Sequence, residues 1–139
     1  MANDYVADRI ALQDVMLNYA AGVDERDFDR YRACFADDVE VLDFGPDPIH
    51  GVDAWVSYVI EALEKYGPTQ HMLGPQFATI DGDRAVTRSD VQALHYLIDQ
   101  PDTTLTLWAT YNTEMARING EWKIQRHQLT ARGTRVQSD

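Results

Sequence analysis

Two tight-turn dipeptides bracket the most informative part of the chain, residues 80–124, which read IDGDRAVTRSDVQALHYLIDQPDTTLTLWATYNTEMARINGEWKI. The dipeptides are Asp81-Gly82 and Asn119-Gly120, and both favour hairpin turns because their residues tolerate positive φ. The segments around them alternate apolar and polar residues with the period of two that is typical of strands. We therefore expect an antiparallel meander, with strands at about residues 84–98, 103–118 and 121–130.

The residues before this meander follow a helical period instead. Residues 5–22 place apolar side chains three and four positions apart, which predicts one amphipathic helix that Gly22 ends. Asp27 is expected to N-cap a short second helix, and a third helix is expected at about residues 52–66.

Two shorter strands complete the predicted elements, at about residues 39–44 and 69–80, and Gly74-Pro75 should bend the second of them. Helices in the first half and strands in the second indicate an α+β fold rather than alternating βαβ units. We predict a cone-shaped α+β barrel, in which three N-terminal helices pack on a strongly curved, mainly antiparallel sheet and enclose a pocket. The whole chain, residues 1–139, is expected to form this single domain.

Composition and charge exclude several classes of protein. Twelve basic residues stand against 23 acidic ones, a formal net charge of −11, which repels a phosphate backbone, so no nucleic-acid partner is expected. The single cysteine, Cys34, allows no intramolecular disulfide and is expected to pack rather than react. No apolar run reaches the roughly 18 residues of a membrane span, and the N-terminus lacks a signal-peptide pattern. We therefore expect a cytoplasmic protein without a membrane partner.

Histidines are the residues most typical of acid–base chemistry here, and the chain has four. His50 lies in a Pro-rich loop and His127 alternates with polar residues, so we expect both to face solvent. His71 follows the third helix, and His95 alternates with small residues whose face is suited to line a cavity. For each of these two, a structural role with satisfied hydrogen bonds stays open. The sequence has no phosphate-binding loop, zinc-binding motif or serine-hydrolase motif, so neither a metal nor an organic cofactor is expected.

Three motifs occur in an order that is typical of one family. They are YAAGVDERDFDRY at residues 19–31 with CFADD at 34–38, TQHMLG at 69–74, and NGEWKI at 119–124. Together they resemble the SnoaL-like polyketide cyclase and scytalone dehydratase family, within the superfamily of ketosteroid isomerase and nuclear transport factor folds. The resemblance covers residues 5–130, and it implies the same cone-shaped fold with a pocket between helices and sheet.

The resemblance also implies four catalytic residues. In lyases of that family a histidine that matches His71 removes a proton, and an aspartate that matches Asp24 orients it. A pocket tyrosine and a second histidine match Tyr19 and His95, which we expect to donate hydrogen bonds to a substrate oxygen. Such a dyad is chemically sound, because a neutral imidazole accepts a proton near physiological pH and a carboxylate fixes its tautomer. From the residues alone, Tyr19 can equally be a core aromatic residue and Asp24 a solvated loop carboxylate.

The expected substrate is a small, largely apolar or cyclic molecule. The residues that we expect to bind it are Phe44, Trp55, Val91, Tyr111 and Arg126. Arg132 and Arg135 are candidates to receive a carboxylate or to cover the pocket mouth, although such arginines are more often surface or interface residues. In scytalone dehydratase, tyrosines match Val23 and Phe44, and polar residues match Ala109 and Tyr111, so the same substrate is not implied.

Three functions remain open at this point. The leading hypothesis is a cofactor-free lyase or isomerase, dehydratase-like, that uses the His71–Asp24 dyad as its base. The second is a polyketide-type aldol cyclase in which only the Asp24 region acts. The third is a non-catalytic small-ligand-binding or assembly subunit of the same fold. A homo-oligomer is also expected, because an open cone leaves one sheet face to be covered, and the resemblance to scytalone dehydratase favours a trimer over a dimer.

Overall fold

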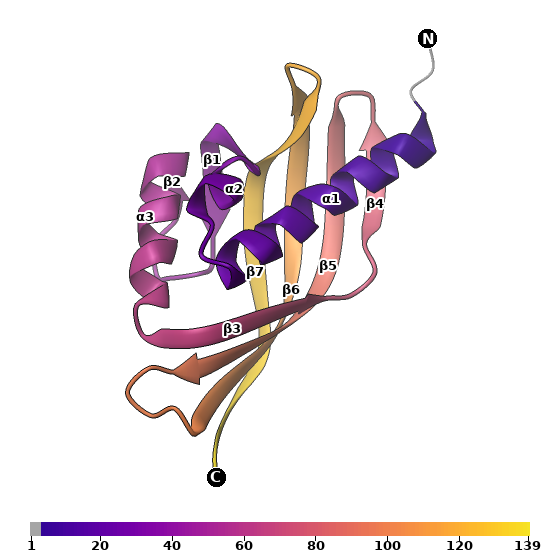
Figure 1. The fold of residues 1–139 in the computed structure, drawn as a ribbon. Coiled ribbons are helices and arrows are strands. Elements are labelled where there is room, and N and C mark those ends of the chain that lie inside the picture. The colour runs from indigo at the N-terminus through magenta and orange to yellow at the C-terminus, as the bar shows by residue number, and fades with distance from the viewer. Residues whose placement is uncertain (1–3) are drawn as a thin grey trace.

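Three helices lie against one face of a curved sheet in the computed structural model of the chain, which describes residues 4–139 (Figure 1). The helices are α1 (Tyr5–Asp24), α2 (Phe28–Arg32) and α3 (Val52–Leu63). The strands are β1 (Phe35–Leu42), β2 (Ile49–His50), β3 (Tyr66–Leu73), β4 (Phe77–Asp81), β5 (Arg84–Leu97), β6 (Thr103–Ile118) and β7 (Glu121–Ser138). This arrangement confirms the predicted α+β fold.

The sheet is seven-stranded, and six of its strands follow the order β2-β1-β7-β6-β5-β3. The seventh, β4, pairs with β5 at residues 84–88, whereas β3 pairs with β5 at residues 91–97. All its pairings are antiparallel except that of β1 with β7, which is parallel. The meander of β5, β6 and β7 is therefore confirmed. Over the described residues 4–139 the sheet does not close, so the cone is an open one rather than a complete barrel.

Helix α1 runs two residues past its predicted end. It begins at Tyr5 and ends at Asp24, and Asp4 caps its N-terminus, because the Asp4 carboxylate accepts hydrogen bonds from two backbone N–H groups in the first turn. The prediction that Gly22 ends the helix is wrong. Gly22 instead marks the point where α2 packs against α1, since a Cβ at this position would lie 2.9 Å from the Cβ of Tyr31. Asp27 caps α2 as predicted, by accepting a hydrogen bond from the Arg30 backbone N–H.

Several strand boundaries differ from the predicted ones because pairing with neighbouring strands decides them. The expected bent strand at residues 69–80 is two strands, β3 and β4, which both pair with β5. Between them the Gly74 N–H donates to the Asp90 carbonyl oxygen, at 2.8 Å. Strand β7 continues well beyond residue 130, because β6 pairs with it as far as Ser138.

The core lies between the helices and the concave face of the sheet. Buried apolar side chains of α1 meet those of β5, β6 and β7, and Trp55 of α3 packs against Phe35 and Phe44. A hydrogen bond from the Trp55 indole N–H to the Tyr31 hydroxyl joins α3 to α2. This packing brings the C-terminal end of α1 beside β3, where the candidate site lies (Figure 1).

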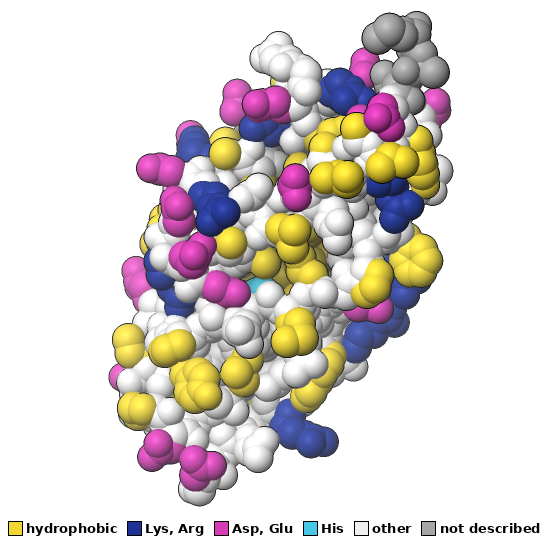
Figure 2. Space-filling model, turned by 45° about the vertical axis from the view of Figure 1, so that its right-hand side comes forward, with side chains coloured by type: hydrophobic (Ala, Val, Ile, Leu, Met, Phe, Trp, Pro, Cys, Tyr) yellow, Lys and Arg dark blue, Asp and Glu magenta, His cyan; other side chains and the backbone are white. Residues whose placement is uncertain are grey.

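The surface carries the acidic charge that the composition indicates. Figure 2 shows Asp and Glu side chains spread over one face, with apolar side chains gathered along its centre and a histidine visible among them. Among the described residues, no helix combines the length and the apolar character needed to cross a membrane.

We expect Gly22→Ala to destabilise the protein, although alanine is ordinarily better than glycine inside a helix by roughly 0.5–1 kcal/mol. The added Cβ would lie within 3.0 Å of the Tyr31 backbone and Cβ, so α2 would have to move. Overpacking of this kind typically costs about 1–3 kcal/mol of the free energy of unfolding, which urea denaturation measures. Gly133→Ala is the matched control, because a Cβ there meets open space. A Gly22→Ala protein as stable as the wild type would contradict the close α1–α2 contact.

Candidate active site

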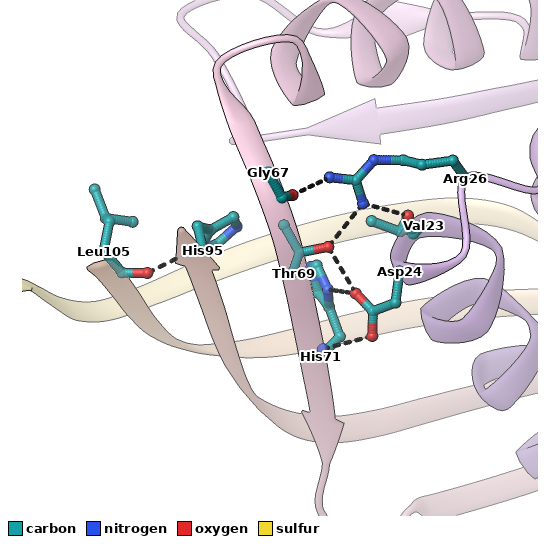
Figure 3. A network of polar contacts seen from close by, with 8 residues as sticks. All are labelled: Val23, Asp24, Arg26, Gly67, Thr69, His71, His95 and Leu105. Carbon is teal, nitrogen blue, oxygen red and sulfur yellow. Dashed lines mark hydrogen bonds and ion pairs between the residues drawn. The ribbon is translucent and has the colours of Figure 1, made fainter. Parts of the chain in front are cut away.

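The last residue of α1 and a residue in the middle of β3 form a close acid–base pair (Figure 3). His71 Nδ1 lies 2.8 Å from Asp24 Oδ1, and the His71 backbone N–H donates to Asp24 Oδ2 at 2.7 Å. An ionised carboxylate only accepts hydrogen bonds, so the hydrogen of the neutral His71 ring is on Nδ1. The lone pair of Nε2 is consequently free to act as a base.

A second layer of hydrogen bonds supports this pair. The Thr69 hydroxyl donates to Asp24 Oδ1 at 3.0 Å, and Arg26 in turn donates to Thr69 Oγ1 at 2.8 Å. Neither Arg26 nor Thr69 is predicted from the sequence as a site residue, although both lie within the motifs at residues 19–31 and 69–74. The position of Thr69, two residues before His71 on the same face of a strand, is a signal that points to it.

The hydrogen bonds keep Asp24 ionised. Burial by itself would raise the pKa of the Asp24 carboxyl, but the donors on His71 and Thr69 outweigh it and leave that pKa below its usual value. An ionised Asp24 stabilises the imidazolium that forms when His71 takes a proton. The pair is therefore suited to general base catalysis.

A cavity of about 280 Å³ adjoins the pair. Its wall is mostly aromatic and aliphatic, and it includes Tyr19, Phe44, Trp55, Tyr66, His71, His95 and Tyr111. Asp24 does not line the cavity but lies behind His71, so a ligand would meet the His71 ring first. An apolar cavity with few polar groups is the usual form of a small-molecule site.

A larger hollow, of about 510 Å³, lies elsewhere between α1, α2 and the β6–β7 turn, and it contains Cys34. Its two arginines are already paired with acidic residues, Arg30 with Glu25 and Arg117 with Asp8. Burial raises the pKa of the Cys34 thiol to about 12, so the thiol is not a nucleophile at neutral pH. We therefore place the candidate site at the smaller cavity.

His95 lies near His71 in the wall of the same cavity, with the two ring centres 5.8 Å apart. Its Nδ1 is 3.1 Å from the Leu105 carbonyl oxygen, which can only accept, so Nδ1 carries the hydrogen. Burial lowers the pKa of His95 and thus favours the neutral ring, whose Nε2 then accepts a hydrogen bond. The hydrogen-bond donor role that we expected for His95 does not fit this tautomer.

Tyr19 also lines the cavity, and its hydroxyl group is within hydrogen-bond distance of a buried histidine, His127. The Tyr19 hydroxyl lies 3.0 Å from His127 Nε2, and His127 Nδ1 lies 2.9 Å from Thr113 Oγ1. His127 is fully buried, so the expectation that it faces solvent is wrong. Burial also raises the pKa of Tyr19 well above its usual value, which keeps its hydroxyl protonated.

One β-bulge explains the position of His127 and that of Arg126. Glu114 pairs with Arg126 and Met115 with Ile124, so Gln125 has no partner on β6 and the alternation of β7 reverses there. Beyond the bulge, His127 points inward. Arg126 points outward, where it forms ion pairs with Glu40 at 3.0 Å and with Glu114 at 3.5 Å. The structure thus does not bring Arg126 to the cavity.

The other residues expected to bind substrate divide in two. Phe44, Trp55 and Tyr111 line the cavity, whereas Val91 is buried in the core and does not reach the cavity wall. Arg132 donates to the Thr110 hydroxyl beside Trp108, on the sheet face opposite the cavity.

Comparisons with known proteins identify the family through a family model and the fold through solved structures. A family model described as a SnoaL-like domain matches residues 4–128. An uncharacterised protein of Mycobacterium tuberculosis is 26% identical over 130 residues, which cover 87% of this chain and 83% of the relative.

Solved structures show the same fold at lower sequence identity. One, described provisionally as a scytalone dehydratase from Novosphingobium aromaticivorans, is 21% identical with a TM-score of 0.86, covering 94% of this chain and 87% of that one. A hexachlorocyclohexane dehydrochlorinase of type 2 is 23% identical with a TM-score of 0.87, and the match covers 96% of this chain and 90% of that chain.

His127 should make stability depend on pH. Burial lowers the pKa of His127 to about 3 in the native state, whereas a histidine in the unfolded chain has a pKa of about 6.5. Below about pH 6.5 the unfolded state therefore binds a proton at His127 that the native state does not bind. The stabilisation is present above about pH 6.5 and is lost as the pH falls toward 3, with a limiting slope of about 1.4 kcal/mol per pH unit. Urea unfolding between pH 7.5 and 5 measures this slope, which His127→Gln should reduce.

The exposed His50 provides the control for this measurement. His50→Gln should retain the wild-type slope. Equal slopes for the wild type and for His127→Gln would show that His127 is not held neutral.

Proposed function

The chain belongs to the SnoaL-like domain family, and on that premise we propose that it is a cofactor-free lyase or isomerase whose base is His71. The observation that carries the proposal is the 2.8 Å contact between His71 Nδ1 and Asp24 Oδ1, with His71 in the cavity wall and Asp24 behind it. The substrate would be a small, largely apolar cyclic molecule, in keeping with the aromatic wall and the volume of about 280 Å³.

In the proposed reaction His71 Nε2 removes a proton from a carbon next to a carbonyl group. The electron pair of the broken C–H bond moves onto the carbonyl oxygen as an enolate, and Asp24 stabilises the imidazolium through Nδ1–H. In an elimination, the enolate then expels a β-hydroxyl group, and the imidazolium returns its proton to that group as it leaves as water. In an isomerisation of a β,γ-unsaturated ketone, the enolate extends over the C=C bond as a dienolate, and the imidazolium returns the proton to the γ-carbon. Either way His71 ends neutral and no redox partner is needed.

Tyr19 and His95 would orient such a substrate. If His127 carries its hydrogen on Nε2 and accepts from Thr113 at Nδ1, the Tyr19 hydroxyl is free to donate to the developing enolate oxygen. The neutral His95 would accept a hydrogen bond from a substrate hydroxyl at Nε2. A cyclic β-hydroxy ketone presents both groups, a carbonyl oxygen and a hydroxyl, and is therefore the first substrate class to test.

The position of Asp24 favours a lyase over the aldol cyclase. In the cyclase hypothesis only the Asp24 region acts, but here the oxygens of Asp24 are occupied by His71 and Thr69, and Asp24 does not line the cavity. A non-catalytic assembly subunit is disfavoured by a different observation. The cavity is open space that reaches Tyr19, His71 and His95, and Phe44 and Tyr111 line it without filling it.

Deuterium exchange provides a test that does not require the natural substrate. In D₂O the protein should exchange the α-hydrogens of cyclic β-hydroxy ketones, which proton NMR follows, and absorbance should report any conjugated enone formed. His71→Ala and Asp24→Asn should each lower the rate by about 10²–10⁴-fold, the usual contribution of a general base. His50→Ala is the matched control, because the His50 ring is exposed and outside the cavity.

Two outcomes would redirect the proposal. Ring closure of a triketone that survives His71→Ala but not Asp24→Ala would indicate the cyclase. A wild-type protein that neither exchanges the α-hydrogens of the cyclic β-hydroxy ketones nor eliminates water from them would overturn the lyase hypothesis. A protein partner would then be sought instead.

A further inference from the structure

Arg26 has a backbone conformation that arginine rarely adopts. Its φ is +56°, in the left-handed region that glycine enters freely and that residues with a Cβ avoid. The residue lies in the turn between α1 and α2, two positions after Asp24. A glycine would fit this turn with less strain, so the contribution of Arg26 comes from its side chain.

The half-buried guanidinium group of Arg26 joins the end of α1 to β3 (Figure 3). One terminal nitrogen donates to the Val23 carbonyl oxygen at 2.7 Å and to Thr69 Oγ1 at 2.8 Å, and the other donates to the Gly67 carbonyl oxygen at 2.6 Å. None of these acceptors is a carboxylate, and no ion pair of Arg26 occurs within residues 4–139. The group is therefore not in place to neutralise an acidic residue by contact.

The bond from Arg26 decides where the Thr69 hydroxyl points. Because Arg26 occupies a lone pair of Thr69 Oγ1, the hydroxyl hydrogen is left to donate, and Asp24 Oδ1 lies 3.0 Å away. Asp24 Oδ1 then receives hydrogens from Thr69 and from His71 Nδ1, while Oδ2 receives the His71 backbone N–H. Three donors from one strand hold the carboxylate in a single orientation.

We propose that Arg26 is a positioning residue that acts through Thr69 and Asp24 to hold His71 in the Nδ1–H tautomer, with its Nε2 lone pair toward the cavity. This role rests on the proposed function, because a fixed tautomer matters for chemistry only if His71 acts as a base. Arg26 does not line the cavity and is not expected to touch a substrate.

The tautomer of His71 can be measured directly, without any substrate. Ring ¹⁵N chemical shifts distinguish a protonated from an unprotonated nitrogen, and a His71→Gln spectrum assigns the His71 signals. At alkaline pH the wild-type ring should be mainly Nδ1–H. Arg26→Gln and Thr69→Val each remove one link of the chain, and each should shift the tautomer ratio toward Nε2–H by roughly fivefold to tenfold, the effect of one hydrogen bond.

Two matched variants separate positioning from general destabilisation. Thr69→Ser keeps the hydroxyl and should restore the wild-type ratio. Arg30→Gln removes a nearby arginine that bonds to Glu25 and Asn18 rather than to Thr69, and it should leave the ratio unchanged. Melting temperatures measured in parallel report how far each variant weakens the fold.

The outcomes distinguish this inference from the proposed function. A wild-type tautomer ratio in Arg26→Gln would overturn the role of Arg26, even if the melting temperature fell, because the arginine would then be only a clamp on the turn. A shifted ratio in both Arg26→Gln and Thr69→Val would support the role. Since no substrate enters the measurement, either result stands whether or not the deuterium-exchange test finds activity.

Discussion

An ionised carboxylate at the C-terminal end of a helix is in an unfavourable place, because the helix dipole is negative there. Asp24 occupies that position in α1, and its compensation comes from another element, strand β3. Its hydrogen bonds therefore do more than arrange two side chains. They attach the end of α1 to the sheet, and they fix the His71 ring at the wall of the cavity that the helices and sheet enclose.

The cavity depends on a different kind of interaction, the packing of aromatic side chains. Tyr19, Tyr31, Phe35 and Trp55 pack with ring centres about 5–6.5 Å apart, and a hydrogen bond from Trp55 to Tyr31 joins α3 to α2. An apolar wall strengthens each hydrogen bond within it, because the local dielectric constant is low. The same wall disfavours charge on His95 and His127, so burial keeps both rings neutral at neutral pH.

In the proposed function, a rigidly held base would act beside a permissive binding surface. His71 is fixed by contacts on the side away from the cavity, whereas most of the cavity wall consists of side chains without strong directional demands. One fold can therefore hold such a pair in place while different wall residues would accept different ligands. Solved structures share the fold at only 21–23% identity, so the fold tolerates wide change in sequence.

Local patterns in the sequence determined most of the architecture. The Asp81-Gly82 and Asn119-Gly120 turns predicted the meander, and the Asp27 cap predicted where α2 begins, because each depends on the conformational preferences of a few adjacent residues. Resemblance to a family, rather than spacing, paired His71 with Asp24, since the two are 47 residues apart in the chain.

Only the tertiary structure decided which side chains of β7 face the interior of the protein. Strict alternation predicts that His127 faces solvent, but the bulge at Gln125 turns His127 inward and Arg126 outward. That bulge is a feature of how β7 pairs with β6, whose register skips Gln125, and no local propensity in the strand encodes it. The contacts of Gly22 and Arg26 could not be predicted from local patterns either. Their partners, Tyr31 and Thr69, come close only when whole elements pack together.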